Sequence, residues 1–202
     1  MDRSSSADPA SLYEVSRHVA LLLLLASGRR VHDLTLLSTN PTQFQELGSS
    51  FVLWPTIGFK TDSSSHQQSG WQLSPNPNPV FTLVSWIRDL VTLSKCRRGS
   101  LPFPHLFLTT RGAVGPASRS VIGGWIRTAL QAAGIAAPPV SLRAAVAHGR
   151  FHVQSSIDFI MQRGNWQRSA LVFRHYVKSV SHFRSPTTAA SSVIHQDFAS
   201  RP

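Results

Sequence analysis

The stretch ASGRRVHDLTLL, Ala26 to Leu37, is the part of the sequence on which the fold prediction depends most. Upstream of it, from Leu12 onward, apolar residues recur at the three- and four-residue spacing of an amphipathic helix. Gly28 interrupts this pattern, and two adjacent arginines follow it. Helical spacing then resumes until Asn40 and Pro41 stop it. The sequence therefore predicts a long helix, a glycine break that presents arginines, and a second helical segment.

A small antiparallel sheet is predicted next along the chain. The segment FVLWPTIGF, Phe51 to Phe59, has the composition of a strand, and GWQLS, residues 70–74, is expected to pair with it as a hairpin with Lys60 near the turn. The remaining pattern predicts a short strand over 106–110 and helices over 80–91, 115–135, 140–153, 155–164 and 169–180. The predicted fold class is mainly α with a small antiparallel β-sheet.

The charge balance points to a polyanionic partner. Twenty Lys and Arg stand against nine Asp and Glu, which gives a formal net charge of +11. Nucleic acid is the first candidate, because each phosphate contact releases counterions. The cations are almost all arginine, whose planar fork suits bidentate phosphate contacts. A ribosomal-type or merely basic protein remains the alternative on charge alone.

Other compositional features exclude several classes of protein. The single cysteine, Cys96, excludes a disulfide framework and a cysteine zinc site within this sequence. The apolar run over 19–26 is too short to span a bilayer and lacks the flanks of a signal peptide, so no membrane partner is expected. The spacings of His148, His152 and His175 match no metal-binding signature. We therefore expect neither a metal nor a cofactor.

Two further segments carry residues suited to phosphate chemistry. VSLR, residues 140–143, ends in Arg143, and GNWQRSALVFRHYV, residues 164–177, contains Trp166 and Tyr176. Tyr176 follows Trp166 by 10 residues and Arg143 by 33. Each of these residues has a structural alternative: the aromatic side chains could pack in a core, and Arg143 could be a simple contact to the DNA backbone. The second tyrosine of the chain, Tyr13, is interpreted as a packing residue.

Together these segments resemble the catalytic domain of the tyrosine recombinases. That family comprises phage integrases, bacterial Xer resolving enzymes and recombinases of eukaryotic DIRS-like and Crypton-like mobile elements. The segment GNW…FRHYV looks closest to the mobile-element branch. The resemblance covers roughly residues 12–181. The family motif A-T-G-hydrophobic-R-x-x-E-L is matched by ASGRRVHDL, which aligns Arg30 and Asp33, and H-x-L-R is matched by VSLR. Lys60 matches the lysine of the family's hairpin.

The resemblance implies a reaction at a DNA phosphodiester without a metal. Tyr176 attacks phosphorus and holds the 3′ phosphate in a covalent link. Arg30 and Arg143 bind the non-bridging oxygens through their N–H forks. Lys60 protonates the departing 5′ oxygen, and the indole N–H of Trp166 hydrogen-bonds one phosphate oxygen.

Supporting roles follow from the same resemblance. Asp33 is expected to brace an arginine or an N–H inside the site. Arg29, Arg168 and Arg174 are expected to contact DNA, with Arg29 at the surface. Structural alternatives stay open here too, because Arg30 could be a solvated helix residue and the alignment of Lys60 along the hairpin is loose.

Two departures from the family bear on activity. Val140 stands where most members carry the histidine of H-x-x-R, and valine can neither accept a proton nor bond a phosphate oxygen. In addition, members usually carry an N-terminal DNA-clamping domain, whereas about eleven residues precede the first predicted helix here. We expect a flexible segment over 1–11, one catalytic domain over 12–184 and a flexible tail over 185–202.

Three functional hypotheses follow. The first is a DNA strand-transfer enzyme that works through a phosphotyrosine, with the related type IB topoisomerases sharing the core chemistry. The second is a catalytically silent DNA-binding remnant of a mobile-element recombinase, and the third an unrelated basic helical regulator. The resemblance implies double-stranded DNA as partner and a homo-tetramer on paired sites, with the tail passed to a neighbour. It also implies a nuclear location in a eukaryote and a cytoplasmic one otherwise.

Overall fold

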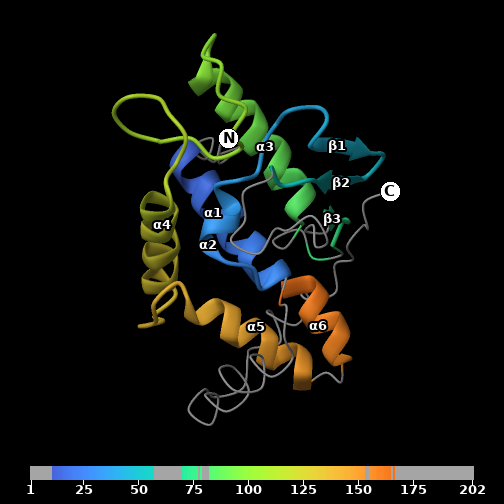
Figure 1. Ribbon diagram of the computed structural model, residues 1–202. Helices are drawn as coiled ribbons and strands as arrows, with labels where there is room; N and C mark the ends of the chain where they lie inside the picture. Colours follow the sequence, from blue (N-terminus) through green and yellow to red (C-terminus); the bar gives the residue numbers. More distant parts are fainter. Residues whose placement is uncertain are drawn as a thin grey trace, which may run out of the picture.

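The computed structural model describes residues 11–56, 70–76, 78, 82–152, 155–164 and 166, and of residues 151, 152, 162 and 163 it describes only the backbone (Figure 1). Lys60, Arg168, Arg174 and Tyr176 lie outside the described residues. The same is true of the helix predicted over 169–180 and of the tail. The predictions for these parts of the chain stay predictions.

The central element is helix α1, Leu12–Ser27, which begins and ends as the sequence predicts. A capping box starts it, because the Ser11 hydroxyl accepts from the Glu14 backbone N–H while the Glu14 carboxylate accepts from the Ser11 N–H at 2.8 Å. Gly28, with φ +66°, ends it in the left-handed conformation. Apolar side chains are buried around most of its circumference, which is typical of a helix enclosed by other elements.

Helices from three parts of the chain pack around α1. They are α3 (Leu83–Arg98), α4 (Arg119–Ala132) and α5 (Ser141–His152). The short helix α2 (Val31–Leu34) follows α1 directly and contacts α4. The helix predicted over 80–91 extends to Arg98 because no breaker occurs before Gly99, and the one predicted over 115–135 starts only at the Ser118 cap.

The sheet has three antiparallel strands in the order β1 (Phe44–Leu47), β2 (Ser50–Leu53) and β3 (Trp71–Leu73). The predicted pairing of β2 with β3 is confirmed, with Phe51 opposite Leu73 and Leu53 opposite Trp71. Strand β1 was not predicted, because most of its side chains are exposed and no buried face creates an alternating pattern. The predicted strand over 106–110 is wrong. Its first three residues are buried, but the segment makes only one isolated bridge, Leu108 to Pro116, and a second bridge joins the preceding His105 to Ser38.

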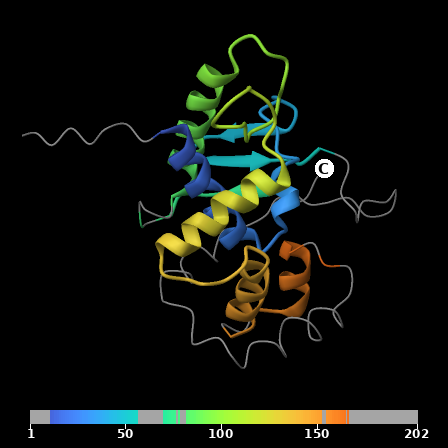
Figure 2. The ribbon, with the colours of Figure 1, turned by 90° about the vertical axis from the view of Figure 1, so that its left-hand side faces the viewer.

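The buried side chains form two clusters. The large one joins α1, α3, α4 and the inner side of the sheet. The small one consists of Ala147, Ile160 and Trp166, with Ile157 and Met161 packed against it. It lies where α5 meets α6 (Ile157–Gly164), at the end of the molecule away from the strands in both views (Figures 1 and 2). The candidate functional site includes residues in contact with both clusters, because Arg29 contacts Trp71 of the large one and Arg143 contacts Trp166 of the small one.

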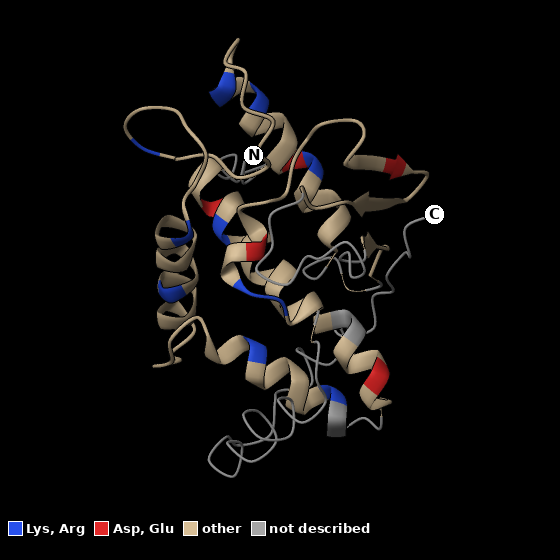
Figure 3. Cartoon of the chain, in the orientation of Figure 1, with Lys and Arg blue, Asp and Glu red and all other residues tan. Residues whose placement is uncertain are grey.

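Basic side chains are distributed over several elements of the described chain, on α3, α4, α5 and the loop that joins α3 to α4 (Figure 3). Acidic side chains are few by comparison. Among the described helices, none combines the length and apolar character needed to cross a membrane.

Candidate functional site

The junction after α1 brings the chain close to α5. The N–H of Gly28 donates to the carbonyl oxygen of Leu24 at 2.8 Å, and the positive φ of Gly28 turns the chain toward α2. A Cβ at Gly28 would lie 3.1 Å from Cγ1 of Val146 on α5. Glycine is therefore favoured here twice, by its backbone conformation and by the close approach of α5.

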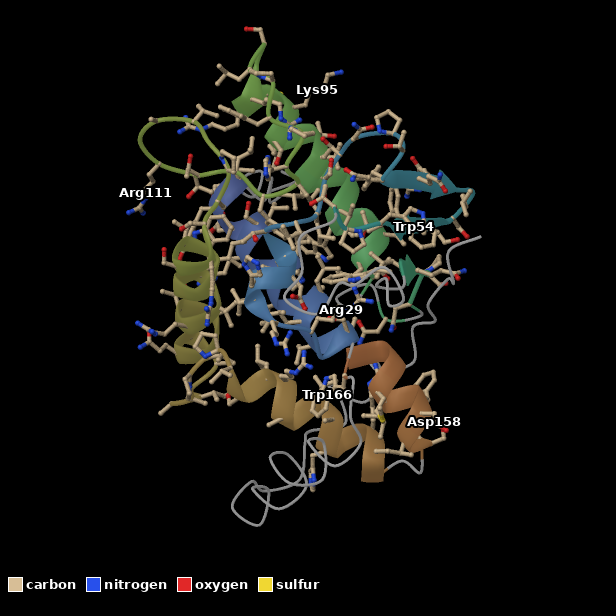
Figure 4. All side chains as sticks on the ribbon, in the orientation of Figure 1. Arg29, Trp54, Lys95, Arg111, Asp158 and Trp166 are labelled. Carbon is tan, nitrogen blue, oxygen red and sulfur yellow. The ribbon has the colours of Figure 1, made fainter. Side chains whose placement is uncertain are left out.

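The two arginines after Gly28 occupy opposite environments. Arg29 lies inside the molecule near the end of α1 (Figure 4) and is only 2% exposed. Its guanidinium carbon is 4.8 Å from the centroid of the Trp71 ring. Burial lowers the pKa of Arg29 to about 9, with Asp33 raising it and Arg143 lowering it. Arg30 is exposed. The expected surface position of Arg29 is therefore wrong, because Trp71 offers its side chain an aromatic face inside the protein. Its role as a DNA contact stays a prediction.

Asp33 is buried at the start of α2, next to the two arginines. Its side chain is 2% exposed, and its carboxylate accepts the backbone N–H of Arg30 at 3.0 Å. Burial raises the pKa of Asp33, while this hydrogen bond and the charges of Arg29, Arg143 and Arg30 act in the opposite direction. The carboxylate thus fixes the backbone of one arginine and lies within the electrostatic reach of two others.

Arg143 and Trp166 come together from α5 and the residues after α6. The Arg143 guanidinium lies 4.4 Å from the centroid of the Trp166 ring, and the two residues are 6% and 8% exposed. The backbone N–H of Trp166 donates to the carbonyl of Met161 at 2.8 Å. Gly164 leaves room for the indole, because a Cβ there would fall onto its Nε1. The indole of Trp166 (Figure 4) therefore lies against Gly164 at the end of α6, and the Arg143 guanidinium lies over its ring.

A small cavity joins these groups and reveals a residue that the sequence reasoning missed. Its lining includes Gly28, Arg143, Gly164, Trp166 and a second arginine of α5, Arg150. Arg150 is 1% exposed and donates from Nη2 to the Ala26 carbonyl oxygen at 2.8 Å. Burial lowers its pKa to about 10. The only feature of the sequence that could have pointed to Arg150 is its position seven residues after Arg143, on the same side of the helix.

The structure thus brings together four of the residues proposed from sequence, Arg29, Asp33, Arg143 and Trp166, and adds Arg150 to them. Arg30 lies beside them with its side chain exposed. Val140 lies in the turn before α5 and is 67% exposed. Within the described ranges, no group of three or more His, Cys, Asp or Glu is arranged to hold a metal ion.

Comparisons of sequence find nothing: no family model and no curated protein matches this chain. Comparisons of structure do. A pre-cleavage complex of the XerH site-specific recombinase bound to its difH substrate superimposes with a TM-score of 0.59 at 11% identity, covering 88% of this chain and 48% of that one. The XerA recombinase gives 0.54 at 20% identity, covering 89% and 59%.

A third solved structure is the Tn1549 transposon integrase in complex with transposon right end DNA. It superimposes with a TM-score of 0.54 at 12% identity, covering 88% of this chain and 57% of that one. The chain spans about half the length of these solved structures, 48% to 59%. Identities this low establish the fold and nothing finer. The described residues, mainly helical with a small three-stranded antiparallel sheet, have the catalytic-domain fold of the tyrosine recombinases.

Proposed function

We propose that this chain is the catalytic domain of a DNA strand-transfer enzyme that works through a covalent 3′-phosphotyrosine. The observation that supports it most is the cluster of Arg29, Asp33, Arg143 and Trp166, built from three separate segments of a chain with a net charge of +11. Within this cluster, the charges of Arg29 and Arg143 both act on the one carboxylate of Asp33, so the formal charges of the three residues sum to a positive value. A DNA phosphate has the charge that such a cluster lacks.

The proposed reaction begins at the scissile phosphate. The Tyr176 oxygen attacks phosphorus, the new bond joins phosphorus to the tyrosine, and the bond to the 5′ oxygen breaks. Lys60 gives a proton to that 5′ oxygen. The phenolic proton passes to water, because Val140 has no atom that can accept it.

Arginines stabilise the transition state in this proposal. Arg143 presents its N–H fork to the non-bridging oxygens, and Trp166 supports it from the side. Arg30, whose side chain is exposed, reaches the DNA from the α1–α2 junction. A donor that is placed for the transition state is typically worth ~3 kcal/mol, or about a hundredfold in rate.

The second candidate is a DNA-binding remnant that no longer cleaves. The observation in its favour is Val140, which is exposed at the turn before Arg143 and cannot take part in proton transfer. In this case the basic side chains would still bind duplex DNA, and binding would weaken steeply with salt.

A suicide substrate separates the two candidates. Purified protein is incubated with duplexes nicked so that religation is impossible, drawn from the repeats that flank the gene and from a random pool. The strand-transfer proposal expects a protease-sensitive protein–DNA adduct that is lost in Tyr176→Phe. The matched control is Tyr13→Phe, since the hydroxyl of Tyr13 on α1 hydrogen-bonds Oγ1 of Thr128 on α4 at 3.0 Å, away from the proposed site. No adduct, together with salt-sensitive binding of DNA, would favour the remnant.

Finer assignments belong to the same proposal. We take residues 12–184 as the catalytic domain and 185–202 as a tail that a neighbouring copy receives in a tetramer on DNA. Closeness to the DIRS-like and Crypton-like branch, and a nuclear location in a eukaryotic host, rest on the sequence motifs around Tyr176.

A further inference from the structure

Arg150 is a buried arginine to which the proposed chemistry gives no role. It lies on α5 seven residues after Arg143, two turns along the same face of the helix. Its side chain is 1% exposed, so it cannot touch a DNA duplex at the surface. Its interactions are therefore with the protein itself.

The main interaction of Arg150 is with the end of α1. Nη2 donates at 2.8 Å to the carbonyl oxygen of Ala26, in the last turn of the helix. Carbonyls in a last turn lack partners within their own helix, and a cation there is favoured by the helix dipole. Helix α1 has no basic residue in its own last turn. Arg150 supplies that cation from α5.

This arrangement is costly for packing alone. Burial lowers the pKa of Arg150 to about 10, and its Nε and Nη1 have no hydrogen-bond partner among the described residues. An apolar side chain of similar length would fill the space without the cost of burying a charge. In other proteins, replacing buried ionic groups by apolar residues is often neutral or stabilising. The contact with Phe159, 5.5 Å from the guanidinium carbon to the ring centroid, offsets only part of that cost.

What Arg150 gains is a fixed relation between two segments of the site. Ala26 is two residues before Gly28, the point from which Arg29 and Arg30 leave α1. Arg143 lies at the other end of the same face of α5, and both arginines of α5 line the cavity that also contacts Gly28 and Trp166. The hydrogen bond from Arg150 to Ala26 therefore links the helix that carries one phosphate-binding arginine to the junction that carries the other.

We propose that Arg150 is a positioning residue, which holds α5 against the end of α1 and so sets the place of Arg143 relative to the Arg29–Arg30 segment. The catalytic part of this inference rests on the proposed function. Its structural part, the coupling of α5 to the α1–α2 junction, can be measured without any reaction.

The test compares Arg150→Met and Arg150→Lys with the wild type. Methionine keeps length and apolar packing but cannot donate to Ala26, whereas lysine keeps a charged donor. Arg98→Met is the matched control, because Arg98 also donates a single bond to a backbone carbonyl, that of His105 at 2.7 Å, outside the site. All variants are checked for folding by circular dichroism.

Hydrogen exchange over residues 24–34 gives the first readout. The inference expects faster exchange there in Arg150→Met, a rate near that of the wild type in Arg150→Lys, and no change in Arg98→Met. Equal exchange in Arg150→Met and the control would overturn it, whether or not the protein cleaves DNA.

Adduct formation at saturating nicked DNA gives the second readout. Because a misplacement of about 1 Å can cost on the order of a hundredfold in rate, Arg150→Met is expected to slow the covalent step by that order while DNA affinity stays unchanged. Arg150→Lys is expected to recover part of the rate. If the wild type forms no adduct, the proposed function is refuted. If the wild type and Arg150→Met form the adduct equally fast, the positioning role of Arg150 is refuted.

Discussion

Gly164 leaves no room for a side chain, so Gly164→Ala is expected to displace the indole of Trp166. A Cβ built at Gly164 would fall onto Nε1 of that indole, 2.6 Å from its Cδ1 and 3.1 Å from its Cε2. Ordinary contacts between carbon atoms are about 3.5–4.0 Å, so the ring must retreat by roughly 1 Å. The displaced ring would also change its contact with Arg143, whose guanidinium lies 4.4 Å from the ring centroid.

The expected magnitude follows from two opposing effects. Overpacking a filled site costs typically 1–3 kcal/mol, and exchanging glycine for alanine in a helix returns up to about 1 kcal/mol. Because Gly164 is the last residue of α6, little of that return applies here. We expect a net loss of roughly 1–2 kcal/mol in the free energy of unfolding of the part of the structure that contains α6.

Urea titration followed by tryptophan fluorescence measures this loss. The matched control is Gly124→Ala in the interior of α4, where an added Cβ meets nothing within 4 Å. That variant is expected to gain roughly 0.5–1 kcal/mol. If Gly164→Ala proves as stable as Gly124→Ala, the close approach of the indole to Gly164 is not a feature of the folded protein, and the placement of Trp166 against Arg143 is refuted with it.

Four other substitutions test the junction after α1. Gly28→Ala is expected to lower the melting temperature, because alanine is strained at φ +66° and its Cβ would lie 3.1 Å from Val146; an unchanged melting temperature would contradict this. Burial raises the pKa of Asp33 above its ordinary 3.8, so the folded state binds that proton more tightly than the unfolded chain does. The contribution of Asp33 to the free energy of unfolding is therefore largest below about pH 3.8 and falls as the pH rises through the folded pKa. Urea titrations at pH values from 3.8 upward should show this decline in the free energy of unfolding for the wild type but not for Asp33→Asn. Arg30→Ala is expected to change the free energy of unfolding by less than about 0.5 kcal/mol, since its side chain is exposed, yet to slow adduct formation about a hundredfold. Arg29→Ala, which leaves a buried space beside Asp33 unfilled, should lower the free energy of unfolding clearly. A larger loss of stability in Arg30→Ala than in Arg29→Ala would refute the burial of Arg29.

Local signals in the sequence predicted much of this fold. Ser11 and Glu14 begin α1 and Gly28 ends it, and each of these acts through backbone groups within a few residues. The pairing of β2 with β3 followed from two apolar segments separated by a polar loop. The apolar run 106–108 was predicted as part of a strand. It is buried, but only Leu108 forms a bridge, because a hydrophobic run does not specify which hydrogen bonds its backbone will make.

The placement of the arginines could not be predicted in the same way. Arg29 and Arg30 are adjacent and chemically identical, and only the arrival of Trp71 from a distant strand decides which of them is buried. Arg150 likewise owes its buried position to a carbonyl of α1, far away in the sequence. Family motifs align one-dimensional positions, whereas burial is decided by the surfaces that meet after folding.

The small cluster around Trp166 gives this domain two levels of cooperativity. Ala147, Ile160 and Trp166 form their own core, with few apolar partners compared with the large cluster around α1. Small units of this kind open by sub-global unfolding, at a lower free energy than the whole domain. We therefore expect Trp166 to separate from Arg143 at a lower free energy than is needed to unfold α1 and the sheet. A phosphate that binds only the closed form would stabilise the cluster of Ala147, Ile160 and Trp166 by mass action. Under the proposed function, DNA binding would therefore favour the closed form of this cluster.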